Sequence, residues 1–196
     1  MLISIDGTVA AEGMAEHETA FPAPGRQEQD PRSWWEEFAR MTRDLLSAAE
    51  SGGYRPDAIR GIRFTGFVPV LTLLDKKGSP VRPAILHTDT RAAGELGELT
   101  REYGIDCTLG NLLPKLLWIR KEEPERFGRV KSVMSAHSYL AYRCTGCLNT
   151  DYDTASIFGG IFDTEQLRYR TDLISRLGLS GELFPPLFPA NGIIGR

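Results

Sequence analysis

Four polar side chains, His87, Thr88, Asp89 and Arg91, lie at the end of a largely apolar run that begins at Pro80. An imidazole, a hydroxyl, a carboxylate and a guanidinium together can bind a small polar ligand through hydrogen bonds and charge. The run itself predicts a strand, and in open α/β sheets ligands bind in the loops beyond the strand ends. We therefore expect a small polar ligand at this strand end.

A second apolar run precedes this segment and must help to position it. Residues 67–75, FVPVLTLLD, are nearly all hydrophobic, which is typical of a strand buried on both faces. The turn Lys76–Ser79 separates the two runs. We predict an α/β fold in which these strands form part of the core.

The first third of the chain predicts a hairpin followed by a helix. Asp6-Gly7 is a two-residue turn signal between short strands at 2–5 and 8–14. Asp30-Pro31 can begin a helix, because Asp caps helices and Pro suits the first helical position. The sequence Ser-Gly-Gly at 51–53 would end it.

The remaining elements follow from apolar spacing and from glycines that can end helices, Gly104 and Gly146 among them. We predict strands at 59–64 and 157–162, the second one regular or bulged, and helices at 91–103, 115–121, 138–143 and 171–177. The helix at 115–121 has the pattern of a short amphipathic helix.

Composition narrows the classes of partner and compartment. The chain has 196 residues, 41% of them hydrophobic and 25% charged, with a net charge of -3. This charge gives no reason to expect a nucleic acid or an anionic membrane as partner. The N-terminus lacks the basic region of a signal peptide, and three cysteines, an odd number, argue against a disulfide framework. We expect a cytoplasmic protein.

Short motifs in colinear order give the chain a family resemblance. Gln29-Asp30-Pro31, followed by Trp34-Trp35, resembles the "EQDP..WW" segment of the FGGY carbohydrate kinases, which include xylulokinases and glycerol kinases. Further matches are TLLD at 72–75, RPAIL at 82–86, Asp89-x-Arg91, KLLW at 115–118, Pro124 with Phe127, SYL at 138–140, Thr145-Gly146, Thr150-Asp151 and IIG at 193–195. The chain resembles xylulokinase-like members most.

The resemblance implies a fold and an activity. The fold would be the actin/hexokinase-like (ribonuclease H-like) α/β domain, with a mixed sheet flanked by helices. The activity would be phosphoryl transfer from ATP, with Mg²⁺, to a hydroxyl of a sugar or polyol, with a ketopentose such as xylulose as the expected substrate. Residues 1–196 would be part of the N-terminal, sugar-binding domain.

The resemblance also implies sugar contacts. Val68-Pro69 occupy the Met-His or Met-Pro position whose loop touches the sugar in xylulokinase-like members, with Phe67 in place of the usual Gln. Asp89 and Arg91 match the family's W-x-D-x-R, with His87 in place of Trp. The alternatives are that Phe67 and Val68 belong to the core, and that Asp89 and Arg91 form a structural ion pair between the strand end and the next helix. The loop 109–114 is several residues shorter than its family equivalent.

The residues of phosphoryl transfer have no counterpart in this sequence. Family members carry a D-x-G-T-[ST] phosphate loop on their first strand, whereas Asp6-Gly7-Thr8 lacks the intervening residue and suits the second hairpin. The catalytic Asp of the family would lie beyond IIG. We expect a domain that lacks its first strand and its C-terminal part, is inactive alone, and is marginally stable or associates, for example as a homodimer. The alternative is a naturally shortened, non-catalytic relative that acts through sugar binding or association.

Other reactive residues have ordinary interpretations. Cys144 and Cys147 form a C-x-x-C at a predicted helix end, which suits neither a closed zinc site nor a redox motif. His137 has a helix-start role as its default. Asp151 and Asp153 could hold a cation, although solvated turn residues are commoner. We expect no resident metal or cofactor site among these residues.

Overall fold

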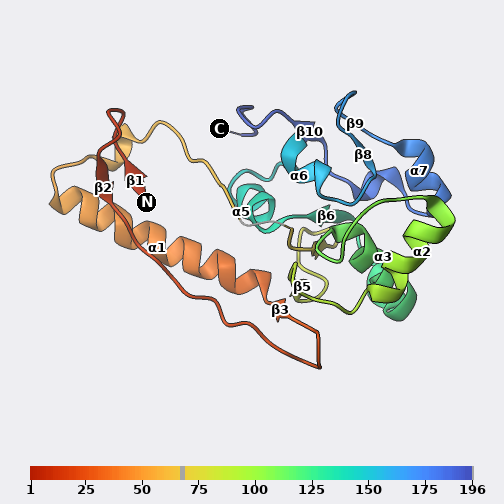
Figure 1. Ribbon diagram of the computed structural model, residues 1–196. Coiled ribbons are helices and arrows are strands. Elements are labelled where there is room, and N and C mark those ends of the chain that lie inside the picture. The colour runs from red at the N-terminus through yellow and green to blue at the C-terminus, as the bar shows by residue number, and fades with distance from the viewer. Residues whose placement is uncertain (67–68, 196) are drawn as a thin grey trace. The chain divides into compact units, whose positions relative to one another are not determined.

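The computed structural model describes residues 1–66 and 69–195 of the chain. Backbone contacts divide it into two compact units. We call Met1–Glu18 with Arg32–Arg63 the hairpin-helix unit, and Thr19–Pro31 with Phe64–Arg196 the core unit. Figure 1 shows the elements of each unit along the chain.

The hairpin-helix unit begins with the predicted hairpin. Strands β1 (Leu2–Ile3) and β2 (Val9–Ala11) pair antiparallel, and both are shorter than expected. The carboxylate of Asp6 organises the turn between them, because its Oδ1 accepts hydrogen bonds from the Ser4 hydroxyl and from Thr8 N. The hydrogen bond from Ser4 and those from Thr8 lower the pKa of Asp6 to about 2.

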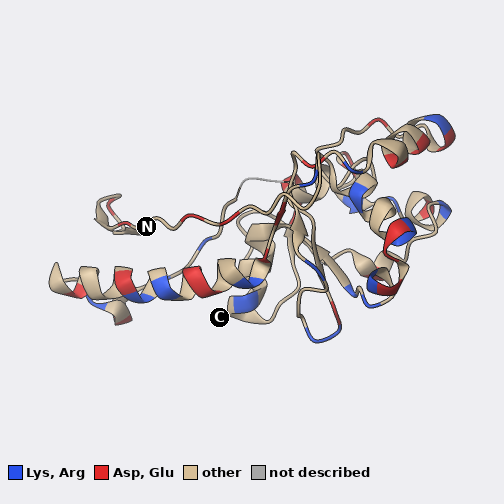
Figure 2. Ribbon diagram, turned by 90° about the horizontal axis from the view of Figure 1, so that it is seen from below, with Lys and Arg blue, Asp and Glu red and all other residues tan. Residues whose placement is uncertain are grey.

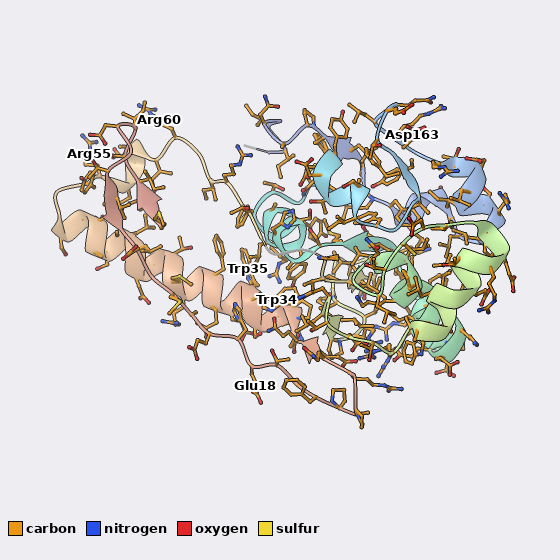
Figure 3. The ribbon with its side chains drawn as sticks, viewed as in Figure 1. Glu18, Trp34, Trp35, Arg55, Arg60 and Asp163 are labelled. Atoms are coloured by element: carbon orange, nitrogen blue, oxygen red, sulfur yellow. The ribbon has the colours of Figure 1, made fainter. Side chains whose placement is uncertain are left out.

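Helix α1 (Pro31–Ser51) confirms the predicted start at Pro31 and end at Ser51. Arginines and acidic residues alternate along it in Figure 2, and Figure 3 places Trp34 and Trp35 near its first turns. A short 3₁₀ helix, η1 (Pro56–Ala58), follows. The predicted strand at 59–64 is wrong: these residues form no regular element, and Ile59 and Ile62 are exposed, so the run lacks both a partner strand and a core.

Four short strands of the core unit lie side by side in the order β3, β5, β4, β6. They are β3 (Glu28–Gln29), β4 (Thr72–Leu74), β5 (Ala84–Ile85) and β6 (Ser132–Met134). The pairs β3–β5 and β4–β6 are antiparallel, and an antiparallel bridge between Leu71 and Ile85 joins them. All residues of β4 are buried, which confirms the prediction of a strand buried on both faces.

Helices cover these strands. They are α2 (Ala93–Tyr103), α3 (Leu112–Glu122), α4 (Pro124–Phe127) and α5 (Ala136–Thr145). Gly104 and Gly146 end α2 and α5 in the left-handed conformation, as the sequence predicted. The α3 segment was expected to be amphipathic, but every residue from Leu112 to Ile119 is buried, so the helix is surrounded by protein along most of its length.

The last part of the core unit is built from short elements: β7 (Thr150–Asp151), α6 (Tyr152–Ser156), β8 (Phe162–Asp163), β9 (Arg168–Tyr169), α7 (Thr171–Arg176), η2 (Gly181–Leu183) and β10 (Leu187–Phe188). Strand β10 pairs parallel with β7, so the strands of the unit pair in both senses. The predicted strand at 157–162 is wrong except for Phe162, because Gly159 and Gly160 take positive φ angles and turn the chain.

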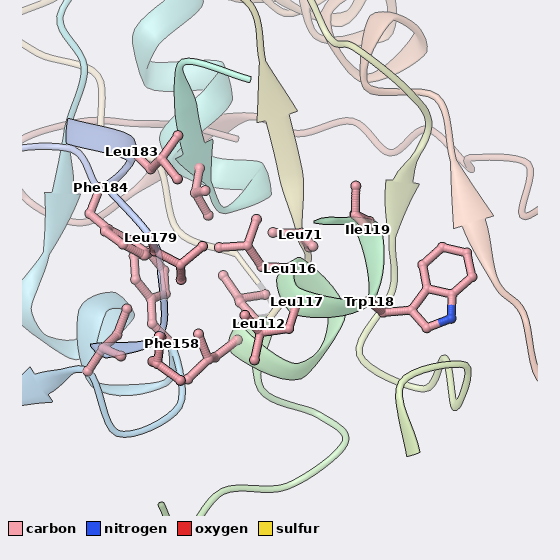
Figure 4. Close-up of a cluster of buried hydrophobic side chains, with 14 of the residues drawn as sticks. Leu71, Leu112, Leu116, Leu117, Trp118, Ile119, Phe158, Leu179, Leu183 and Phe184 are labelled. Carbon is pink, nitrogen blue, oxygen red and sulfur yellow. The ribbon is translucent and has the colours of Figure 1, made fainter. Parts of the chain in front are cut away.

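One hydrophobic core holds the core unit together. Leu71, directly before β4, packs there with side chains of α3, with Phe158, and with Leu183 and Phe184 (Figure 4). The core thus fixes α3 between the strands and the C-terminal segments, and this places the first turn of α3 near the end of β5. Among the described helices, none is long and apolar enough to cross a membrane.

Candidate functional site

The chain beyond β5, residues 86–91, forms what we call the strand-end loop. Its backbone is hydrogen-bonded to the segment before β3: Leu86 N donates to Gln27 O at 3.1 Å, and Thr90 N donates to Gly25 O at 2.8 Å. A side chain at residue 25 would not fit, because φ is +73° and a Cβ atom would lie 2.4 Å from Thr90 Oγ1. Two segments far apart in sequence are therefore locked together at this strand end.

Asp89 is the centre of the strand-end loop and is fully buried. Its Oδ2 accepts a hydrogen bond from Gln27 N at 2.6 Å, and its Oδ1 accepts one from Arg91 N at 3.0 Å. Burial opposes the charge on Asp89, but the hydrogen bonds from the Arg91 side chain, Gln27 N and Arg91 N outweigh it, so the pKa of Asp89 lies below its usual value. Asp89 is therefore an ionised, internally satisfied carboxylate.

Arg91 binds Asp89 through two N–H groups on one edge of its guanidinium group. Its Nε and Nη2 donate to the two carboxylate oxygens of Asp89 at 2.8 and 2.7 Å. Nη2 also lies 2.7 Å from Glu28 Oε1 of β3. The guanidinium carbon stands 5.1 Å from the centre of the Trp118 ring, and that of Arg26 stands 5.2 Å from the same ring. Stacking on an aromatic face favours a cation in such a place.

A second arginine extends this arrangement. Arg82, which is as buried as Arg91, forms an ion pair with Glu28 Oε1 and reaches Glu123 Oε1 at 2.9 Å. We call Glu28, Arg82, Asp89, Arg91 and Glu123 the charge cluster. Sequence reasoning singled out only Asp89 and Arg91 from it; Arg82 and Trp118 lay within the RPAIL and KLLW motifs, but their roles were not predicted.

The contacts of the charge cluster bear on the two interpretations of Asp89 and Arg91. Their side chains are 0% and 2% exposed, and their polar atoms face protein partners. These contacts favour the structural ion pair, although it holds the strand-end loop to residues 25–28 and not to the following helix α2. Direct contact of Asp89 or Arg91 with a sugar stays a prediction.

The other expected sugar contacts lie before β4. Val68, like Phe67, falls outside the described residues. Pro69 is half-buried and leads directly into the buried Val70 and Leu71. The described chain before this point comes close to α5, because a Cβ atom added at Gly66 would lie 3.1 Å from His137 Cβ. The structure thus does not bring Pro69 into the hydrogen bonds of the charge cluster.

His137 lies in a polar group that could suggest nucleophilic catalysis. Its Nε2 is 3.4 Å from Asp151 Oδ2 and 3.1 Å from Thr154 Oγ1, and Ser135 Oγ lies 3.2 Å from Nδ1. However, Ser135 caps α5 and Asp151 caps α6 with their side-chain oxygens, and Ser135 is fully buried. The hydrogen bond from His137 holds the pKa of Asp151 well below its usual range. The group therefore serves two helix starts, as expected for His137.

Lys115, in the first turn of α3, is fully buried. Its Nζ donates hydrogen bonds to three backbone carbonyl oxygens: Leu109 O at 2.6 Å, Gly110 O at 3.2 Å and His87 O at 3.3 Å. Burial lowers the pKa of Lys115 to about 8; the charge of Asp89 opposes this shift, and the charge of Arg91 adds to it. Sequence reasoning used this lysine only as part of KLLW; the signal for its role was a charged residue inside an apolar helix.

The described residues do not fit the phosphates of ATP at the Asp6 turn. The amide of Gly7 donates to Ser4 O at 3.0 Å, and the amide of Thr8 donates to Asp6, so these groups are already used within the hairpin. No group of three or more His, Cys, Asp or Glu side chains suited to a metal ion occurs within residues 1–66 and 69–195. Cys144 and Cys147 are free thiols, as is Cys107.

Comparison with known proteins shows which family this chain is similar to. The model of the FGGY family of carbohydrate kinases, N-terminal domain, matches residues 1–196. A xylulose kinase of Staphylococcus xylosus is 27% identical over 97% of this chain, and one of Haemophilus influenzae is 31% identical over all of it. The chain spans 40% and 42% of the length of these two relatives.

Solved structures agree in fold. The xylulose kinase of Rhodospirillum rubrum matches 98% of this chain and 41% of its own with a TM-score of 0.89 at 28% identity. The glycerol kinase of Plasmodium falciparum, with ADP, has a TM-score of 0.78 at 18% identity, which shows the shared fold alone. The predicted actin/hexokinase-like α/β fold with strands paired in both senses is thereby confirmed. The chain belongs to the FGGY family of carbohydrate kinases and corresponds to the N-terminal domain of that family.

Proposed function

We propose that this chain is the sugar-binding part of an ATP-dependent carbohydrate kinase that phosphorylates a ketopentose such as xylulose. The observation that carries the proposal is the family match over residues 1–196, together with the likeness in sequence and fold to xylulose kinases. ATP with Mg²⁺ would supply the phosphoryl group.

The charge cluster supports a sugar site beside the strand-end loop. A sugar site needs polar groups at fixed positions, and backbone atoms give such positions only where the loop is rigid. Asp89 and Arg91 hold residues 86–91 against residues 25–28 through hydrogen bonds and ion pairs. We propose that Val68 and Pro69 contact the sugar and that Asp89 and Arg91 form the wall behind it.

We further propose that residues 1–196 bind the sugar but do not transfer phosphate. The sequence contains no D-x-G-T-[ST] segment, and the amides of the Asp6 turn are already hydrogen-bonded. Phosphoryl transfer requires donors that surround the phosphates and a carboxylate that accepts the hydroxyl proton. In this proposal other residues of a longer kinase supply them.

Calorimetric titration of the chain with D-xylulose, D-ribulose, xylitol and glycerol tests the sugar site. We expect heat of binding with a ketopentose, and weaker binding in Pro69→Ala. The matched control is Pro56→Ala, because Pro56 begins η1 in the hairpin-helix unit and is not among the proposed sugar contacts. Equal binding by both variants would exclude Pro69 as a contact, and no binding of any sugar would contradict the sugar-binding proposal.

A coupled assay of ADP release tests whether residues 1–196 transfer phosphate. Residues 1–196 with MgATP and xylulose should show no activity above the protein-free rate. The complete product of the natural gene should phosphorylate the sugar; failure there would favour the non-catalytic relative. Sugar phosphorylation by residues 1–196 alone would overturn the assignment of transfer to other residues.

A further inference from the structure

We propose that Lys115 is a positioning residue of the sugar site, whose ammonium group joins the strand-end loop to the loop before α3. The inference rests on the proposed function, because it assigns the sugar to the strand-end loop. Lys115 would act on sugar affinity through backbone carbonyl groups and would not touch the sugar.

The geometry is that of a cation enclosed by carbonyl oxygens. An ammonium group has three donors and no acceptor, and Lys115 Nζ uses them on His87 O, Leu109 O and Gly110 O. His87 belongs to the strand-end loop, two residues before Asp89, whereas Leu109 and Gly110 lie in the loop before α3. One charged atom therefore fixes the distance between two loops.

The loop before α3 is also hydrogen-bonded to a different segment, the turn at residues 157–159. Asn111 Nδ2 donates to Ile157 O at 2.8 Å, and Leu113 N donates to Phe158 O at 2.9 Å. Asn111 Oδ1 also accepts a hydrogen bond from Thr108 N at 2.7 Å. These bonds hold the loop to the 157–159 turn but not to the strand-end loop. Loss of the ammonium group should thus change the spacing of the loops while the core unit stays folded.

The burial of Lys115 excludes a direct chemical role. Its side chain is enclosed, and its three donors are occupied by protein carbonyls. A general base or a phosphate-binding lysine must reach the substrate. The buried ammonium group instead holds three carbonyl oxygens together.

The test is the complete kinase with Lys115→Ala, Lys115→Arg and the matched control Lys121→Ala, which removes a largely exposed lysine of the same helix. We expect Lys115→Ala to raise KM for the ketopentose about tenfold or more, because hydrogen bonds from a charged donor are the strong ones. The kcat and the KM for ATP should change less than about twofold. Lys121→Ala should behave as the parent.

Chemical rescue separates this role from a general loss of packing. Ammonium or methylammonium ions should restore the sugar KM of Lys115→Ala, whereas sodium ions at equal ionic strength should not. Lys115→Arg should retain part of the affinity because it keeps a cation. A folded Lys115→Ala with an unchanged sugar KM, or with a reduced kcat alone, would overturn the proposal.

A measurement on the unmodified protein covers the case in which the variants fail to fold. The ammonium of Lys115 should lose a proton near pH 8, so the sugar affinity of the parent should fall as the pH rises from about 7 to 9.5. The charged or titratable groups of the surrounding segments are His87, Asp89, Arg91, Glu95, Asp106 and Cys107. Cys107→Ser should keep this alkaline fall, because burial and the charge of Asp106 raise the pKa of the Cys107 thiol above its usual value. A flat profile would overturn the proposal for Lys115, whereas the absence of any sugar binding would overturn the proposed function as well.

Discussion

Ion pairs occur in two different settings in this chain. On α1, Arg40 lies 2.6 Å from Glu37 and 3.1 Å from Asp44, and these side chains are 53%, 35% and 65% exposed. In the charge cluster, Arg91 pairs with Glu28 and with Asp89 at 2.7 Å each, but the side chains are 2%, 12% and 0% exposed. The chemistry is the same, and only the access of water differs.

This difference decides what each group of charges does. Exposed pairs contribute little to stability, because water and salt screen them and the side chains lose freedom. A buried pair need not stabilise the fold either, since desolvation offsets the attraction, but the loss of one partner leaves a buried charge uncompensated. The charge cluster therefore fixes a geometry, whereas the charges of α1 mainly keep a helix hydrated.

The largest effect should come from removing the central cation. Arg91→Met leaves Asp89 and Glu28 buried beside an apolar side chain, so we expect the free energy of unfolding to fall by about 3–5 kcal/mol. Urea unfolding followed by circular dichroism measures it. A loss below about 1 kcal/mol would mean that water enters the cluster freely.

A second comparison uses one glycine from each region. Gly25→Ala places a Cβ atom 2.4 Å from Thr90 Oγ1 at a φ of +73°, whereas Gly7→Ala, at a φ of +90°, meets nothing within 4 Å. We expect a loss of about 2–3 kcal/mol for Gly25→Ala and about 1 kcal/mol for Gly7→Ala. Equal losses would show that the residue 25 segment moves away from the strand-end loop at no cost.

The pH dependence of the free energy of unfolding offers a third comparison, between Asp89 and Asp6. Hydrogen bonds lower the pKa of both carboxyls in the folded chain, although burial opposes this at Asp89. A lowered folded pKa gives stability that is present above the unfolded value of 3.8 and is lost as the pH falls below it. Asp89→Asn should cost about 1–2 kcal/mol at pH 7 and flatten the acid side of the stability profile.

Asp6→Asn is the exposed counterpart in this experiment. It should change the slope of the stability profile only between about pH 4 and pH 2, since the pKa of Asp6 is lowered from 3.8 to about 2. The midpoint of urea unfolding, recorded at intervals of pH, reports both variants. A parent-like acid profile for Asp89→Asn would contradict an ionised Asp89.

The smallest effect should come from α1. Arg40→Gln removes both of its exposed ion pairs and keeps a good helix former, so we expect a change below about 0.5 kcal/mol. Thermal unfolding at low and high salt measures it. A loss comparable to that of Arg91→Met would remove the distinction between the two settings.

Local signals predicted the elements whose ends depend on particular residues. Pro31 begins α1, and Gly104 and Gly146 end α2 and α5, because these residues restrict or permit specific backbone angles. The strand predicted at 59–64 failed because apolar composition alone does not provide a partner strand. Strand β6 was not predicted, since its Ser132–Met134 segment acquires strand structure by pairing with β4.

The candidate site was predictable only in part, for a related reason. The spacing of Asp89 and Arg91 marked a polar strand end, but Glu28 joins them from a segment far along the chain, and Arg82 joins them from the other end of β5. Lys115 lay in the apolar helix α3. The burial of this helix from Leu112 to Ile119 depends on its packing against α2 and the C-terminal segments. Such contacts follow from the fold and not from local sequence.

The Oε1 atom of Glu28 serves Arg82 and Arg91 at once, and this has a consequence for sequence change in the family. A single oxygen shared by two cations makes the tolerance of each arginine depend on the other and on residue 28. Replacing one arginine removes one of the two positive charges beside the Glu28 carboxylate. This changes which residue is most favourable at the position of the other arginine. Substitutions at 28, 82 and 91 should therefore be strongly epistatic, so that lineages exchange them together or retain all three.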